Sequence, residues 1–174
     1  MKLTPTTEKF ILHWGEMGSR WGVNRTVAQI HALLYLSPKP LNAETISETL
    51  GVARSNVSTS LKELQSWELI KGVPVMGDRR DYFETHKDVW DIFFAIAEQR
   101  KRREFDPTLS VLRECVIDGD DDPGLDPQTR QRIQNTLEFL EQLMKWYDQI
   151  KTISPKTLSK VMKLGAKIQT LIGK

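Results

Sequence analysis

The sequence predicts a mainly α-helical protein that carries one small β-hairpin. Apolar residues recur at spacings of three and four through most of the chain, which is typical of helices that are packed on one side. β-prone residues gather only between Leu69 and Thr85. A capping residue followed by proline favours the start of a helix, and this pair occurs at Thr4-Pro5, Asp106-Pro107, Asp126-Pro127 and Ser154-Pro155.

Composition narrows the class of protein. The 174 residues suffice for one domain, or for a small domain with an extension. No apolar run approaches the roughly 18–20 residues of a membrane span, and Met1–Phe10 lacks the apolar stretch of a signal peptide. The single cysteine, Cys115, excludes an internal disulfide framework and a multi-cysteine zinc site, and we expect it to be buried. We therefore expect a soluble, reduced, cytoplasmic protein.

The first two helices have readable ends. A helix from about Pro5 to Trp21 is predicted by the apolar stripe Phe10, Trp14, Met17 and Trp21. Asn24 can cap a second helix over Arg25–Leu36, which Ser37-Pro38-Lys39-Pro40 ends because the residue before a proline avoids helical dihedral angles.

The stretch that follows predicts a helix-turn-helix. Asn42 can cap a helix over Ala43–Leu50, and a further helix runs from about Arg54 to Trp67. Gly51 lies at the turn, where a residue that tolerates positive φ is needed. Apolar contacts between the two helices are expected from Ile46, Leu50, Val57, Leu61 and Leu64. This motif places its second helix in the major groove of DNA.

The outward face of that second helix is rich in hydrogen-bonding groups. Serine and threonine are mediocre helix formers, so the presence of several of them in one helix suggests a functional role for their side chains. Such side chains suit phosphate and base-edge contacts, with arginine on guanine and asparagine on adenine. The candidate DNA-binding residues are Arg54, Ser55, Asn56, Ser58, Thr59 and Lys62. The alternative is the solvated face of an ordinary helix.

A hairpin directly after a helix-turn-helix makes a winged helix. We predict strands over Leu69–Met76 and Asp81–Thr85, with a turn over Gly77–Arg80 that places Arg79 and Arg80 at the wing tip. Arginine there can enter a narrow minor groove, and Asp78 can hold an arginine in an ion pair. The alternative is a soluble turn of mixed charge. Residues 39–87 contain seven Lys/Arg and seven Asp/Glu, so binding would be local rather than broadly basic.

The rest of the chain is predicted to be helical. Thr85 and Asp88 resemble a capping box that opens a helix to about Glu104, and further helices are expected over 107–117, 127–150 and 155–172. The acidic segment 118–126 reads as a linker. We divide the chain into 1–105, the winged helix with its N-terminal helix, and 106–174, a helical C-terminal region. The last helix has an apolar stripe, Leu158, Val161, Leu164, Ile168 and Leu171, and a basic face. A bundle core, a dimer interface and an anionic membrane surface are the alternatives for it.

The chain resembles the MarR-type winged-helix transcriptional regulators, in particular the GbsR-like branch. The resemblance covers about residues 5–105 and is carried by residues 10–18 (FILHWGEMG), 28–36 (AQIHALLYL), 41–46 (LNAETI) and 51–58 (GVARSNVS). It implies a homodimer on a pseudo-palindromic operator, with dimerisation helices in residues 106–174. The family's Asp-x-Arg wing pattern falls on Asp78 and Arg80, which implies a minor-groove arginine and its support.

The same resemblance implies a quaternary-amine effector such as choline. A cation can be held over aromatic faces, and the candidate pocket residues are Trp14, Trp21, Tyr35, Trp90, Phe93 and Phe94. The alternative is that these rings belong to the core, which is the commoner role of an aromatic stripe at helical spacing.

No enzymatic constellation is recognised. His13, His31 and His86 lack metal-binding spacing, and the acidic segment lacks the glycine and glutamate of a calcium loop. We therefore predict no enzyme, no cofactor, no metal and no membrane partner. The sequence favours a DNA-binding transcriptional regulator acting as a homodimer. The alternative is a winged helix used as a protein-interaction module.

Overall fold

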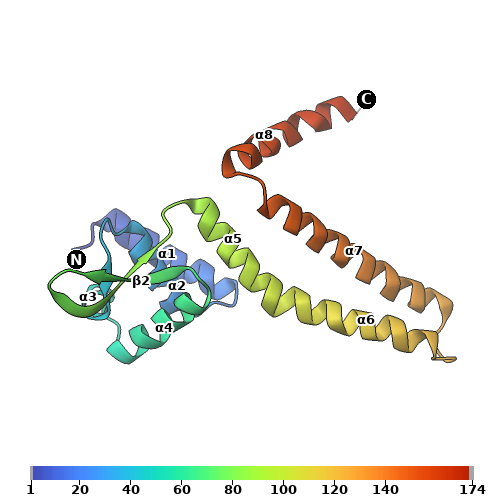
Figure 1. Ribbon diagram of the computed structural model, residues 1–174, viewed down its shortest axis with the longest axis horizontal. Coiled ribbons are helices and arrows are strands. Elements are labelled where there is room, and N and C mark those ends of the chain that lie inside the picture. Colours follow the sequence, from blue (N-terminus) through green and yellow to red (C-terminus); the bar gives the residue numbers. More distant parts are fainter. Residues whose placement is uncertain (1, 173–174) are drawn as a thin grey trace. The chain divides into compact units, whose positions relative to one another are not determined.

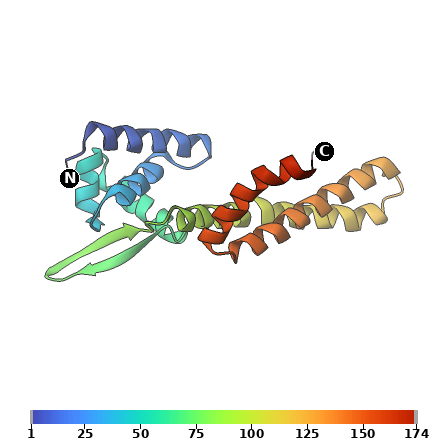
Figure 2. The ribbon, with the colours of Figure 1, turned by 90° about the horizontal axis from the view of Figure 1, so that it is seen from above.

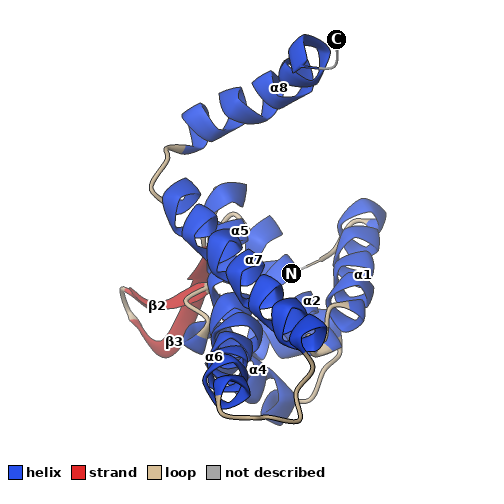
Figure 3. Ribbon diagram, turned by 90° about the vertical axis from the view of Figure 1, so that its right-hand side faces the viewer, coloured by secondary structure: helices blue, strands red, loops and turns tan. Residues whose placement is uncertain are grey.

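The structure is a computed structural model that describes residues 2–172, with side chains described up to Leu164. It divides into two compact units, Met1–Ile96 and Ala97–Lys174, which are taken here one at a time. Helices account for most of both units, and the strands lie in the first (Figure 1, Figure 3). The predicted fold class, mainly α with a small β wing, is confirmed.

The first unit is a winged helix preceded by a long helix. Its helices are α1 (Pro5–Arg20), α2 (Arg25–Leu36), α3 (Ala43–Leu50), α4 (Arg54–Ser66) and the start of α5 (Val89–Arg100). Its strands are β1 (Leu41–Asn42), β2 (Ile70–Val75) and β3 (Asp78–Thr85). Three predicted caps are confirmed, because the side chains of Thr4, Asn24 and Asn42 each accept a hydrogen bond from a backbone N–H of the first helical turn.

Helix α2 lies at the centre of this unit. It contacts α1, α3, α4 and β3, and its residues are buried on almost every side. Ile30 and Leu33 of α2 meet Ile46 of α3 and Val57 and Leu64 of α4 in one fully buried cluster. This cluster fixes the helix-turn-helix against the rest of the unit.

Helix α1 approaches α2 through glycine. A Cβ at Gly18 would lie 2.6 Å from the Cβ of Ala28, a distance that real side chains do not adopt. The buried face of α1 is therefore Ile11, Gly15 and Gly18. The predicted aromatic stripe is not that face: it lies beside it and is only partly covered, and Trp21 at its end is 54% exposed.

The strands form a three-stranded antiparallel sheet in the order β1-β3-β2. The two-residue strand β1 was not predicted, and it pairs Leu41 with Phe83 and Asn42 with Tyr82. Between β2 and β3 the register shifts next to Pro74, which lacks an N–H and suits such an irregularity.

The wing tip differs from the prediction. The turn is at Met76 and Gly77, where Gly77 has φ 81° and Met76 is fully exposed. Arg79 and Arg80, predicted at the tip, lie inside β3 because this strand already begins at Asp78. Figure 2 shows the hairpin reaching out beyond the helices of this unit.

The predicted capping box at Thr85 is wrong. Thr85 is the buried last residue of β3, and its hydroxyl donates to the carbonyl of Leu69 at 2.7 Å. Asp88 starts α5 instead, by accepting from the N–H of Trp90 at 2.7 Å. Between them, the Lys87 ammonium donates to the carbonyls of Leu34 and Ser37, each at 2.8 Å, at the end of α2.

The second unit contains a π-turn, η1 (Lys101–Phe105), followed by α6 (Asp106–Asp120), α7 (Pro127–Lys151) and α8 (Pro155–Ile172). The predicted break at Asp106-Pro107 is wrong, because helical backbone runs on through these residues. The π-turn accommodates the proline: the N–H of Asp106 donates five residues back, to Lys101, so the helix widens just before a residue that has no N–H.

Helices α6 and α7 pair within this unit (Figure 1). Ion pairs join Arg113 to Glu141 at 2.8 Å and Arg130 to Asp120 at 3.2 Å. Asp126 caps α7, as predicted. Cys115 is exposed on α6, so the expectation of a buried thiol is wrong.

Several apolar side chains of the second unit face solvent. On α6 and α7 these are Val111, Ile117, Phe139 and Trp146, and on α8 they are Val161, Met162 and Leu164. Leu158 of the predicted α8 stripe is buried, whereas the side chains of Ile168 and Leu171 lie outside the described residues. Within residues 2–172, the helices are too short or too polar to cross a membrane.

His31 is buried in α2 without charge. Its Nε2 lies 3.1 Å from the Thr85 hydroxyl, whose own proton goes to Leu69, so the Nε2–H donates. Burial, with smaller effects of the nearby charges on His86 and Lys87, lowers the pKa of His31 to about 4.

This burial predicts an acid-sensitive fold. The unfolded chain binds a proton at His31 from its ordinary pKa of 6.5, whereas the folded chain does so only near 4. The contribution of neutral His31 to the free energy of unfolding should therefore be complete above pH 6.5. The free energy of unfolding should fall by roughly 3 kcal/mol as the pH drops to 4. Urea unfolding of the wild type and of His31→Gln at pH 7 and pH 4.5 measures this. The prediction fails if both proteins lose the same stability, and His13→Gln, an exposed site, serves as the control.

Candidate nucleic-acid interface

The exposed face of α4 begins immediately after a tight turn. Gly51 has φ 64°, and the Ser47 hydroxyl donates to the carbonyl of Val52 at 2.6 Å across the turn. The next helix is thereby fixed with one face on the core, made by Val57, Ser60, Leu61 and Leu64. The six residues of α4 that were predicted to contact DNA are all exposed: Arg54, Ser55, Asn56, Ser58, Thr59 and Lys62.

A hollow of about 490 Å³ lies where α4 meets β3 and the start of α3. Arg54, Ser58 and Lys62 line it from α4, and Arg79 and Arg80 line it from β3. Glu44 and Asp81 contribute carboxylates to the same hollow, so its charged groups are of both signs. Helix α4 and the wing therefore share one surface.

Arg80 is held on β3 by its neighbours at alternate positions. Its Nε donates to both oxygens of Asp78 at 3.0 Å, and its Nη2 donates to the Tyr82 hydroxyl at 3.3 Å. Tyr82 in turn donates to Asp78 at 2.8 Å. The Arg80 side chain and backbone N–H, with Tyr82, hold the pKa of Asp78 well below its usual range, and Asp78 raises the pKa of Arg80. The sequence reasoning paired Asp78 with Arg80 but missed Tyr82.

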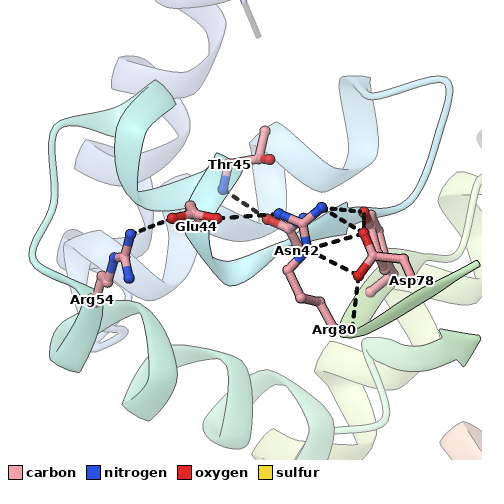
Figure 4. Close-up of polar contacts among 7 residues, drawn as sticks. Asn42, Glu44, Thr45, Arg54, Asp78 and Arg80 are labelled. Atoms are coloured by element: carbon pink, nitrogen blue, oxygen red, sulfur yellow. Dashed lines mark hydrogen bonds and ion pairs between the residues drawn. The ribbon is translucent and has the colours of Figure 1, made fainter. Parts of the chain in front are cut away.

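Glu44 links this cluster to α4. One carboxylate oxygen accepts from Nη2 of Arg54, and the other accepts from Nη1 of Arg80 at 3.2 Å. Figure 4 shows the Glu44 carboxylate between the two guanidinium groups. The sequence reasoning missed Glu44 because an acid in the first turn of a helix needs no partner beyond the helix dipole. The pairing of β1 with β3 brings Glu44 close to Arg80. Because β1 has only two residues, the sequence carries no periodic pattern that would predict this pairing.

The six predicted pocket aromatics do not form one group. Trp14 stacks on Phe10 at 5.4 Å, and Phe10 stacks on Tyr35 at 6.5 Å. On α5, Trp90 meets Phe93 edge-on at 6.2 Å, and Phe93 meets Phe94 edge-on at 5.4 Å. Trp21 is 54% exposed at the C-terminal end of α1. The described residues contain no group of three or more His, Cys, Asp or Glu that could hold a metal ion.

A polar helix after a tight turn, with a hairpin beside it, defines a winged helix-turn-helix protein. Residues 21–81, which include the winged helix, match the model of the MarR family.

Curated relatives agree with this assignment. The HTH-type transcriptional repressor OpcR of Bacillus subtilis (strain 168) is 19% identical over 131 residues, which are 74% of this chain and 71% of OpcR. The HTH-type transcriptional repressor GbsR of the same organism is 21% identical over 137 residues, 77% of this chain and 76% of GbsR. A crystal structure of a transcriptional regulator, 20% identical, superposes with a TM-score of 0.66 over 84% of this chain and 95% of that one. This likeness supports the fold.

The Asp78 carboxylate should be the main restraint on the Arg80 guanidinium. In Asp78→Asn, exchange of the Arg80 Nε–H with solvent should quicken severalfold, because Nε loses a charged acceptor. Nitrogen-15 NMR of the arginine side chains measures this rate. Asp81→Asn removes the same charge three residues along β3 and should leave the rate unchanged; equal effects of the two variants would refute the assignment.

Proposed function

We propose that the protein is a sequence-specific DNA-binding transcriptional regulator. The observation that carries this proposal is the surface shared by α4 and β3. It combines an exposed row of hydrogen-bonding side chains with an arginine that Asp78 and Tyr82 hold in place. A winged helix that served only as a protein-interaction module would have no use for such a row. The relatives named as transcriptional repressors support the proposal, and they favour the GbsR-like branch within the family.

On DNA, the exposed face of α4 would enter the major groove. Arg54 and Asn56 have the groups that pair with guanine and adenine edges, while Ser58 and Lys62 suit phosphates. Thr59 donates to the carbonyl of Ser55 at 3.1 Å, so it would act through its oxygen as an acceptor or through its methyl group. Arg79 and Arg80 would address the adjacent minor groove.

We propose that the protein acts as a homodimer on a pseudo-palindromic site. The second unit supports this proposal through its exposed apolar side chains on α6 and α7, which a folded protein normally covers. Val111 and Ile117 lie on α6, and Phe139 and Trp146 lie seven residues apart on α7. Two copies would place their α4 helices about one helical turn apart, ~34–36 Å.

The regulator can be tested by selection from a random duplex pool at ~150 mM salt. The wild type should enrich an inverted repeat, and Arg80→Ala should bind that repeat about 1–3 kcal/mol more weakly, because a specific minor-groove contact is lost. Arg25→Ala, an exposed arginine on α2 beside Glu16, is the matched control and should bind as the wild type does. A folded, dimeric wild type that enriches no sequence would favour the protein-interaction module.

We further propose that a quaternary amine such as choline releases the operator by binding the α5 aromatics. Phe93 stands at 85° to Trp90 and at 69° to Phe94, so these rings offer faces in two directions to a cation, although Trp90 and Phe94 lie at only 29° to each other. Phe10 and Trp14, by contrast, are stacked at 17°. Choline should therefore lower operator affinity in the wild type and in Trp14→Ala, but not in Trp90→Ala. Fluorescence anisotropy of labelled operator measures this release, and a retained response in Trp90→Ala would rule out this cage.

A further inference from the structure

One carboxylate links two arginines that belong to different reading elements. Arg54 is the first residue of α4, Arg80 lies in the wing, and Glu44, near the start of α3, accepts from both. The three side chains are exposed by 71%, 53% and 40% for Arg54, Arg80 and Glu44. The contact is therefore on the surface, where DNA would have to meet it.

Few donors of Arg80 are left for another ligand. A guanidinium carries five N–H groups. Nε and Nη2 donate to Asp78, Nη2 also reaches Tyr82, and Nη1 donates to Glu44, which leaves one N–H on Nη1. Arg54 contacts Glu44 through Nη2 alone among the described contacts, and its side chain is 71% exposed. The two side chains are thus fixed in direction while keeping some donors.

The cluster of Arg54, Arg80, Glu44 and Asp78 has no net charge. Arg54 and Arg80 carry two positive charges, and Glu44 and Asp78 carry two negative ones. Non-specific DNA binding depends almost wholly on net positive charge that displaces counterions from phosphates. Base recognition depends instead on donors held in the correct direction. A carboxylate in this place weakens the first kind of binding and supports the second.

We propose that Glu44 is a specificity-determining residue that positions Arg54 and Arg80 together and suppresses their binding to phosphates of unrelated DNA. The proposal rests on the DNA-binding function proposed above and assigns a role within that same surface. It makes the recognition helix and the wing act as one unit, because a change in one arginine is felt by the other through the shared carboxylate.

The first test uses the free protein and needs no DNA. In Glu44→Gln, rotation of the Arg54 guanidinium should quicken severalfold in nitrogen-15 NMR, because its charged partner is gone. Glu48→Gln is the matched control: it removes the same charge from the same helix, at an exposed residue with no described ion pair. Equal rotation rates in the three proteins would overturn the positioning role.

The second test compares the selected operator with a scrambled duplex over a range of salt concentrations. Glu44→Gln should bind the scrambled duplex about 3–10-fold more tightly, with a salt slope steeper by about one unit, as one more phosphate contact gives. Operator affinity should change by less than twofold, so the specificity ratio should fall. Glu48→Gln should leave both the ratio and the slope near those of the wild type.

The outcomes separate the two proposals. A wild type that prefers no sequence refutes the regulator, and the role of Glu44 falls with it. A wild type that prefers its operator, with an unchanged ratio in Glu44→Gln, refutes the role of Glu44 alone. If Glu44→Gln binds the operator and the scrambled duplex more tightly by the same factor, the effect is one of general charge and the role of Glu44 is refuted. The same conclusion follows if Glu48→Gln changes the specificity ratio as much as Glu44→Gln does. Both variants keep the size of the native side chain at surface sites, and thermal unfolding verifies that they fold.

Discussion

The pairing of β1 with β3 is the contact on which the site depends. It involves only two residues of β1, yet it attaches the wing to the start of α3. Asn42 is buried and has two roles: it pairs with Tyr82 in the sheet and caps α3 by accepting from the N–H of Thr45 at 2.9 Å. Continuing the antiparallel register by two residues leads from Asn42 to Glu44 and from Tyr82 to Arg80, the pair that meets in the ion pair.

Most of the fold could be predicted because its signals are local. Caps such as Asn24 and Asn42 act within one helical turn, so their meaning does not depend on distant parts of the chain. The same holds for Gly51, where the left-handed backbone of the turn selects the residue. The polar face of α4 could be predicted for a similar reason, because the 3.6-residue period of a helix determines which side chains share a face.

The features that sequence reasoning missed depend on distant partners. A strand as short as β1 has no periodicity to detect, and Glu44 acquires its role only when β3 is beside it. Thr85 looked like a cap, but Leu69 and His31 occupy its hydroxyl at the end of β3. Asp106-Pro107 looked like a helix start, yet the π-turn before it lets the helix continue, at a place where local rules predict a break.

The close approach of α1 and α2 has a consequence for how sequences of this kind can diverge. Gly18 and Ala28 together fill a space that holds one methyl group, since a second Cβ would lie 2.6 Å from the first. We therefore expect the two positions to change together. A related chain with alanine at the first should carry glycine at the second, and larger residues at both should be absent where the helices keep this spacing. An alignment of distant relatives would then show covariation between these two buried positions, and the cause would be the volume of a single methyl group.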